Sequence, residues 1–303
     1  MSSPSALRHH AFIHTSDEEY VERTVAFLMD GLQAGERCLV GNTRDGIAAV
    51  REALGPDAAR VSFLDIGSVY TRPARTIATY FGAFRRHAAA GGAVRAVASA
   101  SQHGPTAEDW DEFAAYEAIT NVAYAHLPVW VVCAYDANAT PDRVLEAAWQ
   151  THPEVLSEHW QTSEAFEDPP ELVRRLTRAP EELPQLRSFA AGDDLERFRE
   201  RLARELAQEQ VIASKALDML VAGTELAANA VRHGGGIEEV RVGRVEGRFV
   251  CEVVDRGPGF DDPLAGYRAP RDGPGSGLWV ARQLTWRIEW FHSPRGFTVR
   301  AWL

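Results

Sequence analysis

Residues 224–234 read Thr-Glu-Leu-Ala-Ala-Asn-Ala-Val-Arg-His-Gly, a helical pattern that ends at a glycine. Glu225 and Asn229 are four positions apart, so their side chains project from one helical face, one turn apart, beside the apolar Leu226 and Ala230. An amide oxygen can bind Mg²⁺, and a carboxylate can act as a general base toward a hydroxyl group or water. Taken alone, the pattern is equally typical of a solvated helix face.

Two glycine-containing stretches follow in the sequence. Residues 253–260 read Val-Val-Asp-Arg-Gly-Pro-Gly-Phe, so an apolar strand leads Asp255 into a turn that contains Gly257 and Gly259. Glycines permit close approach of the backbone to a ligand, and a buried carboxylate can accept a hydrogen bond from an exocyclic amine. Residues 272–284 run from a glycine-rich loop into an amphipathic helix, whose free N–H groups can cradle phosphate. An ordinary turn and a flexible loop are the alternatives.

In this order and spacing, the three stretches resemble the N, G1 and G2 boxes of the GHKL (Bergerat-fold) ATPases. The short first box is similar to that of the anti-sigma-factor serine/threonine kinases. The resemblance covers about residues 190–303 and implies an α/β sandwich with a mixed, mostly antiparallel sheet that binds ATP and Mg²⁺. The resemblance implies that Glu225 is the general base and Asn229 the Mg²⁺ ligand. It implies that Asp255 accepts a hydrogen bond from the adenine amine, in a turn shaped by Gly257 and Gly259, and that Thr298 is the threonine beside this aspartate. The phosphate loop would consist of Gly275, Ser276 and Gly277.

The resemblance also implies partners and an activity. An anti-sigma factor of this type holds a sigma factor and phosphorylates an anti-anti-sigma (STAS) protein on serine or threonine. Two alternatives stay open: a non-catalytic, ATP-dependent binding module, and a signalling protein that resembles a sensor histidine kinase. A phosphorelay kinase needs an acceptor histidine just before its ATPase domain, and no histidine lies between His159 and His233.

The first half of the chain shows another pattern. From about residue 10 to 160, short apolar runs alternate with longer amphipathic stretches, which predicts a parallel sheet covered by helices on both faces. This part resembles the MEDS sensory domain, a RecA/KaiC-like module, at His9-His10, at residues 16–20 and at residues 27–37. The resemblance implies that this part senses an unidentified small ligand.

The sequence therefore predicts an α/β protein of two domains, a sensory domain over residues 1–160 and an ATPase domain over 191–303. Residues 161–190 are rich in proline and acidic residues and are expected to form the linker. Within the first domain, the apolar spacing predicts a helix over residues 17–34 with Ser16 as its N-cap.

Composition excludes several functions. Lys215 is the only lysine and is followed by Ala216, so neither domain contains the Gly-Lys-[Ser/Thr] of a P-loop. The chain of 303 residues carries a formal net charge of −11, which opposes broad binding to nucleic acid. No apolar run has the length of a membrane span, and the N-terminus has no signal-peptide pattern. We therefore expect a cytoplasmic protein without direct contact to nucleic acid or membrane, and the sequence leaves a homodimer open.

Two further observations concern metal ligands. The three cysteines lie far apart in apolar runs and form no CxxC pair, which predicts buried, reduced thiols. His9, His10 and His14 lie near Asp17 and Glu18 in the sequence, and such a group could bind Zn²⁺ or a related metal. We expect a hydrogen-bonded surface at the start of the chain instead.

Overall fold

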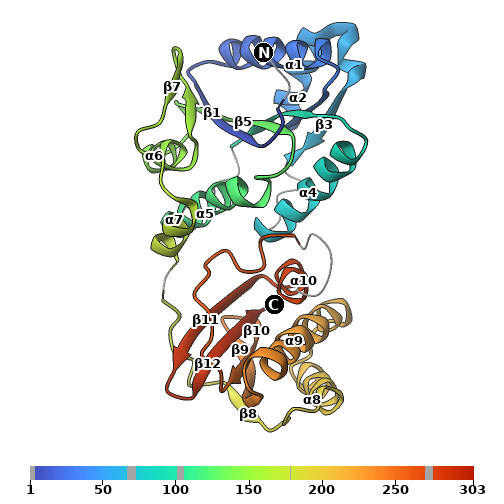
Figure 1. Cartoon of the computed structure of the whole chain (residues 1–303), viewed down its shortest axis with the longest axis vertical. Coiled ribbons are helices and arrows are strands. Elements are labelled where there is room, and N and C mark those ends of the chain that lie inside the picture. Colours follow the sequence, from blue (N-terminus) through green and yellow to red (C-terminus); the bar gives the residue numbers. More distant parts are fainter. Residues whose placement is uncertain (1–3, 67–72, 101–105, 178, 270–275) are drawn as a thin grey trace. The chain divides into compact units, whose positions relative to one another are not determined.

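The computed structural model describes residues 4–66, 73–100, 106–177, 179–269 and 276–303 (Figure 1). The chain divides into two units, Met1–Thr177 and Arg178–Leu303. No helix in the described ranges combines the length and the apolar character that a membrane span requires.

The first unit contains a seven-stranded sheet with the order β3-β2-β4-β5-β1-β6-β7. Its strands are β1 (Arg8–His14), β2 (Arg37–Asn42), β3 (Val61–Asp65), β4 (Val94–Ser99), β5 (Val129–Asp136), β6 (Glu154–Leu156) and β7 (Trp160–Thr162). Neighbouring strands are parallel, except that β6 and β7 are antiparallel. This confirms the mostly parallel sheet predicted for the first domain.

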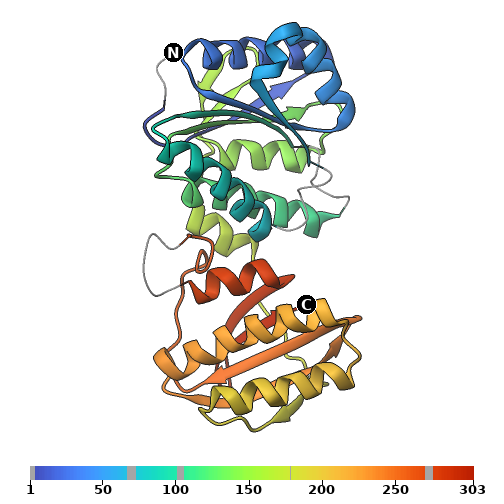
Figure 2. The same cartoon turned by 90° about the vertical axis from the view of Figure 1, so that its right-hand side faces the viewer.

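Helices cover both faces of this sheet (Figure 2). They are α1 (Asp17–Gln33), α2 (Arg44–Leu54), a 3₁₀ helix (Gly55–Arg60), α4 (Pro73–Ala89), α5 (Ala107–Ala123), α6 (Asp142–Thr151) and α7 (Pro169–Leu176). The predicted cap of α1 is present, since Ser16 Oγ accepts a hydrogen bond of 3.1 Å from the backbone N–H of Glu19. Part of the expected linker is ordered, because α7 packs against α5.

The second unit is a five-stranded sheet with the order β11-β12-β10-β9-β8. Its strands are β8 (Arg187–Phe189), β9 (Ile237–Val245), β10 (Arg248–Asp255), β11 (Arg287–Ser293) and β12 (Gly296–Trp302), and its helices are α8 (Leu195–Gln208), α9 (Ala213–His233) and α10 (Gly277–Leu284). All pairs of described strands are antiparallel, which agrees with the mostly antiparallel sheet that was expected, although no parallel pair makes it mixed among the described strands. The helices pack on one face of this sheet, which makes the domain an α/β sandwich (Figure 2).

Alternation along β10 assigns its side chains to the two faces of the sheet. Cys251 and Val253 belong to the main core, which also contains Leu226 of α9 and Ala281 of α10. Val250 lies on the opposite face, where it packs with Trp302 and Leu186. Side chains of β10 at alternate positions counted from Val253 therefore face the helices.

Candidate functional site

The end of α9 and the end of β10 meet at Gly234 and Asp255. Asp255 lies two residues after Val253 on β10, so its side chain faces the helices as well, and it is 7% exposed. A Cβ placed on Gly234 would lie 2.3 Å from Cγ of Asp255, and one on Gly257 would lie 2.7 Å from Cα of Gly234. Both distances are far below van der Waals contact, so these two positions accept only glycine without a shift of the backbone or of the aspartate. The structure thus joins the first and second sequence boxes around one carboxylate.

The Asp255 carboxylate has one protein partner and one free oxygen. Its Oδ1 accepts a hydrogen bond of 2.8 Å from the backbone N–H of Gly257. Within the described part of the chain, Oδ2 accepts no hydrogen bond. Burial raises the pKa of Asp255, while the Gly257 hydrogen bond and the nearby His292 act in the opposite direction. A ligand that donates a hydrogen bond to Oδ2 would compensate part of the desolvation of this carboxylate.

The first box also meets the third box, because α9 packs against α10. Glu225 and Asn229 are half-buried on α9. A Cβ on Gly277, the first residue of α10, would lie 2.4 Å from Oε2 of Glu225, so this carboxylate lies directly against the start of that helix. Ser276, the N-cap, provides no side-chain hydrogen bond to α10, which leaves N–H groups at this end available to an anion. Gly275 of the expected phosphate loop lies outside the described residues.

Asn229, the expected magnesium ligand, already has a partner. Its Oδ1 accepts a hydrogen bond of 3.3 Å from Nη2 of Arg232, one turn further along α9. Arg232 is exposed and also donates to the carbonyl of Ala228. A cation at Asn229 Oδ1 would therefore displace a solvent-exposed guanidinium, which costs little.

Gly259 shapes the turn as the sequence predicts, for a reason that the sequence does not reveal. Its φ is +70°, a conformation that favours glycine, and a Cβ there would lie 2.2 Å from the ring of Phe297. Phe260 packs on Phe297 and on Trp290, with ring centroids 5.2 and 4.9 Å apart. These three aromatic side chains line the turn after Asp255, and sequence reasoning missed them because they come from three separate segments.

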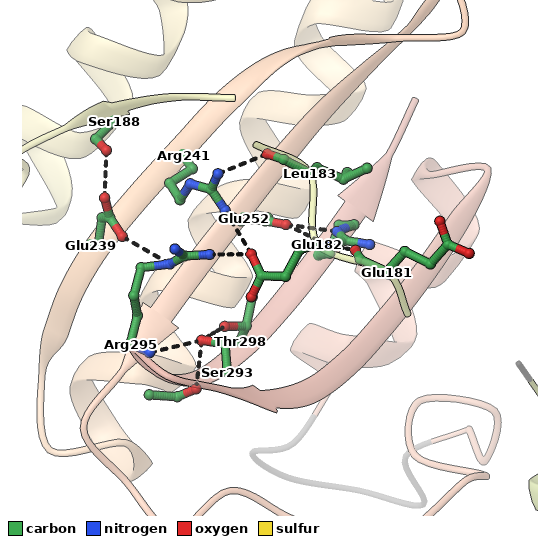
Figure 3. A network of polar contacts seen from close by, with 12 residues as sticks. Glu181, Glu182, Leu183, Ser188, Glu239, Arg241, Glu252, Ser293, Arg295 and Thr298 are labelled. Carbon is green, nitrogen blue, oxygen red and sulfur yellow. Dashed lines mark hydrogen bonds and ion pairs between the residues drawn. The ribbon is translucent and has the colours of Figure 1, made fainter. Parts of the chain in front are cut away.

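The register of β12 places Thr298 away from the expected position. Asp255 pairs with Phe297, and Thr298 pairs with Val254, whose side chain points to the opposite face of the sheet. There the Thr298 hydroxyl lies 3.1 Å from Oγ of Ser293, in the polar network of Figure 3. The expectation that Thr298 lies beside the adenine aspartate is therefore wrong: Phe297 lies there.

The histidines at the start of the chain are also placed differently from expectation. They are buried, whereas Asp17 and Glu18 are exposed, so they form neither a surface nor a site with these two acids. His14 Nδ1 lies 3.2 Å from the carbonyl of Ser16. Nε1 of Trp130 donates a hydrogen bond of 3.2 Å to Nδ1 of His10, and burial lowers the pKa of His10 to about 4.

The nucleotide-site residues fit ATP and Mg²⁺ in three respects. Asp255 offers an acceptor oxygen, and Gly234 and Gly257 let the backbone pack directly against its carboxylate. The start of α10 offers N–H groups to phosphate, and the Glu225 carboxylate lies at the same end of that helix. Asn229 offers an amide oxygen that a divalent cation accepts.

Comparisons with known families agree with this geometry. Residues 8–153 match the family model described as the MEDS, MEthanogen/methylotroph, DcmR Sensory domain. Residues 189–302 match the histidine kinase-like ATPase domain. No curated protein matches the chain. A sensory domain joined to a kinase-like ATPase domain is the make-up of a signalling regulator, and both sequence resemblances are confirmed at the level of these domains.

Proposed function

We propose that this chain is an ATP-binding anti-sigma regulatory factor that phosphorylates an anti-anti-sigma (STAS) partner on serine or threonine. The position of Glu225 against Gly277 carries the proposal, since it brings a carboxylate to the end of α10 where phosphate would bind. The MEDS domain would control this activity in response to a small ligand. The sigma factor is the second partner, and such a function belongs in the cytoplasm, without direct contact to nucleic acid.

Each side chain has a task in this mechanism. ATP with Mg²⁺ supplies the phosphoryl group and neutralises its charge. Asp255 accepts a hydrogen bond from the adenine amine, and Asn229 holds the cation through its amide oxygen. The N–H groups at Ser276 and Gly277 bind phosphate oxygens. Glu225 accepts the proton of the attacking serine or threonine hydroxyl as its oxygen bonds to the γ-phosphorus and the bond from that phosphorus to the bridging oxygen breaks, with ADP as the leaving group.

The preference for adenine over guanine gives a first check of this arrangement. The 6-oxo group of guanine has no hydrogen to donate to Asp255 Oδ2, and two acceptor oxygens would face each other. GTP should therefore compete poorly with ATP for the site. Equal competition would contradict the assignment of Asp255.

Phosphotransfer is tested with the full chain, radiolabelled ATP and STAS proteins captured as its partners. Label in phosphoserine or phosphothreonine of the partner supports the kinase, and acid-labile label on histidine supports the histidine kinase-like alternative. ATP-dependent capture of a sigma factor with no label on any STAS protein supports the non-catalytic binding module. Absence of ATP binding by the folded chain would contradict all three functions.

A further inference from the structure

Four potential metal ligands from four separate segments converge in the interior of the first unit. His9 lies on β1, Glu117 on α5, Cys133 on β5, and His152 directly after α6. All four residues are buried, and their ligand atoms lie within 4.8 Å of one another. This is a different group from the three histidines that the sequence brings together, and only His9 belongs to both.

The two imidazoles are held so that Nε2 points inward. His152 Nδ1 lies 2.8 Å from the carbonyl of Ala148, an acceptor only, so Nδ1 carries the proton. Asn121 donates its amide to the carbonyl of Thr151, at 2.8 Å, which turns its Oδ1 toward His9 Nδ1 at 3.1 Å. His9 Nδ1 therefore donates as well. Oxygen partners at Nδ1 that present Nε2 to a common point are the usual outer shell of a histidine-ligated metal.

The protons available do not satisfy the groups that meet at this point. Nε2 of His9 lies 3.2 Å from Oε2 of Glu117 and 3.5 Å from Sγ of Cys133. Nε2 of His152 is buried and has no hydrogen-bond partner among the described residues. Two nitrogen lone pairs, a carboxylate oxygen and a sulfur thus face one another around a single thiol proton. A cation between them would satisfy this buried set of acceptors.

Four of the six separations between the ligand atoms are close to the edges of a zinc tetrahedron, and all six lie within 4.8 Å. Zn–N and Zn–O distances of about 2.0 Å with Zn–S of about 2.3 Å separate N and O by about 3.3 Å, and N or O from S by about 3.5 Å. The observed separations are 3.2 Å and 3.6 Å from Glu117 Oε2 to the two histidine nitrogens, and 3.5 Å from Cys133 Sγ to both His9 Nε2 and Glu117 Oε2. These four values need only small adjustments to close around one ion, and His152 Nε2 would move toward His9 and Cys133.

We propose that His9, Glu117, Cys133 and His152 form a zinc-binding site in the sensory domain. The charges balance: Zn²⁺ with one thiolate, one carboxylate and two neutral imidazoles has no net charge, as a buried centre requires. Binding replaces the thiol proton of Cys133, which is released to solvent. His9, Glu117 and Cys133 also line a largely apolar cavity together with Tyr80, Phe84 and Phe113.

The test uses the full chain, treated with a chelator and then titrated with Zn²⁺ or Co²⁺. We expect one ion per chain and, with Co²⁺, a thiolate-to-metal charge-transfer band together with the intense d–d bands of a tetrahedral ion. Cys133→Ser should remove the charge-transfer band and weaken binding at least tenfold. Cys38→Ser is the matched control, because Cys38 is a buried thiol of the same sheet that donates to the carbonyl of Leu28, as a serine hydroxyl also can. The Cys38→Ser variant should change neither the charge-transfer band nor the affinity for the metal ion.

A second measurement does not depend on folding of a variant. X-ray absorption at the zinc edge of the wild-type chain should show one sulfur and three nitrogen or oxygen neighbours. A coordination sphere without sulfur would overturn the proposal. So would a folded chain that takes up no zinc, or a Cys133→Ser variant that binds zinc as tightly as the control.

Discussion

The Cα of Gly234, at the end of α9, lies against the carboxylate of Asp255, at the end of β10, so closely that a Cβ would come within 2.3 to 2.6 Å of three carboxylate atoms. The backbone of Gly234, with φ −97° and ψ 9°, is one that alanine also adopts. The glycine is therefore required by this contact and not by its own conformation.

Gly234→Ala should displace the Asp255 carboxylate and weaken ATP binding at least tenfold, with little change in the helix itself. Titration calorimetry on the full chain measures this effect. Gly82→Ala is the control, because a Cβ on this α4 glycine would meet its nearest atom, the end of the Arg86 side chain, at 3.5 Å. Equal affinities in the two variants would mean that ATP binds elsewhere.

Asp255→Asn should weaken ATP binding by about 1–3 kcal/mol, the cost of leaving a buried donor without a good acceptor. It should also stabilise the nucleotide-free domain at neutral pH. The sign follows from the raised pKa: the folded state disfavours the charged carboxylate, so its stability contribution is present below the ordinary aspartate pKa and is lost as the pH rises through the raised value. Chemical denaturation of both proteins at pH 7 checks this, and a lower free energy of unfolding for the Asp255→Asn variant would contradict it.

The ATP affinity ratio of wild type to Asp255→Asn should fall as the medium is acidified. The ionised carboxylate is the stronger acceptor for the adenine amine. Burial raises the pKa of Asp255, so protonation begins above the ordinary aspartate range. The ratio cancels protonation of the nucleotide, which affects both proteins equally. A ratio that stays constant from pH 8 to 5, measured by calorimetry, would show that the carboxylate charge does not contribute to binding.

Glu225→Gln should preserve ATP binding and slow phosphotransfer to the STAS partner by about 10²–10⁴-fold, the usual contribution of a general base. Binding is measured by calorimetry and transfer by radiolabelled ATP. Glu200→Gln serves as the control, because this exposed carboxylate of α8 lies outside the site. Undiminished transfer in Glu225→Gln would remove this residue from the mechanism.

Thr298→Val should leave ATP affinity unchanged, because Thr298 points to the face of the sheet opposite Asp255. Among the described residues, the substitution removes the hydroxyl contact with Ser293 shown in Figure 3. A tenfold loss of affinity, with a normal free energy of unfolding, would return Thr298 to the nucleotide site.

The sequence alone determined the features that depend on neighbouring residues. The apolar spacing and the Ser16 cap define α1, strands that alternate with helices define the parallel sheet, and the boxes around Asn229 and Asp255 identify the ATPase domain. Each is assembled from local patterns of about 11–18 residues, in which helix period, strand period and turn chemistry act directly.

Tertiary structure decided what depends on register and on packing between distant segments. The β10–β12 pairing places Phe297 rather than Thr298 beside Asp255, and a shift of one residue would reverse that choice because successive side chains point to opposite faces. The cluster of His9, Glu117, Cys133 and His152 likewise forms only when β1 pairs with β5 and the inward faces of α5 and α6 close over them. No local pattern marks these four residues as neighbours, because their proximity is produced by burial of the sheet and not by their order in the chain.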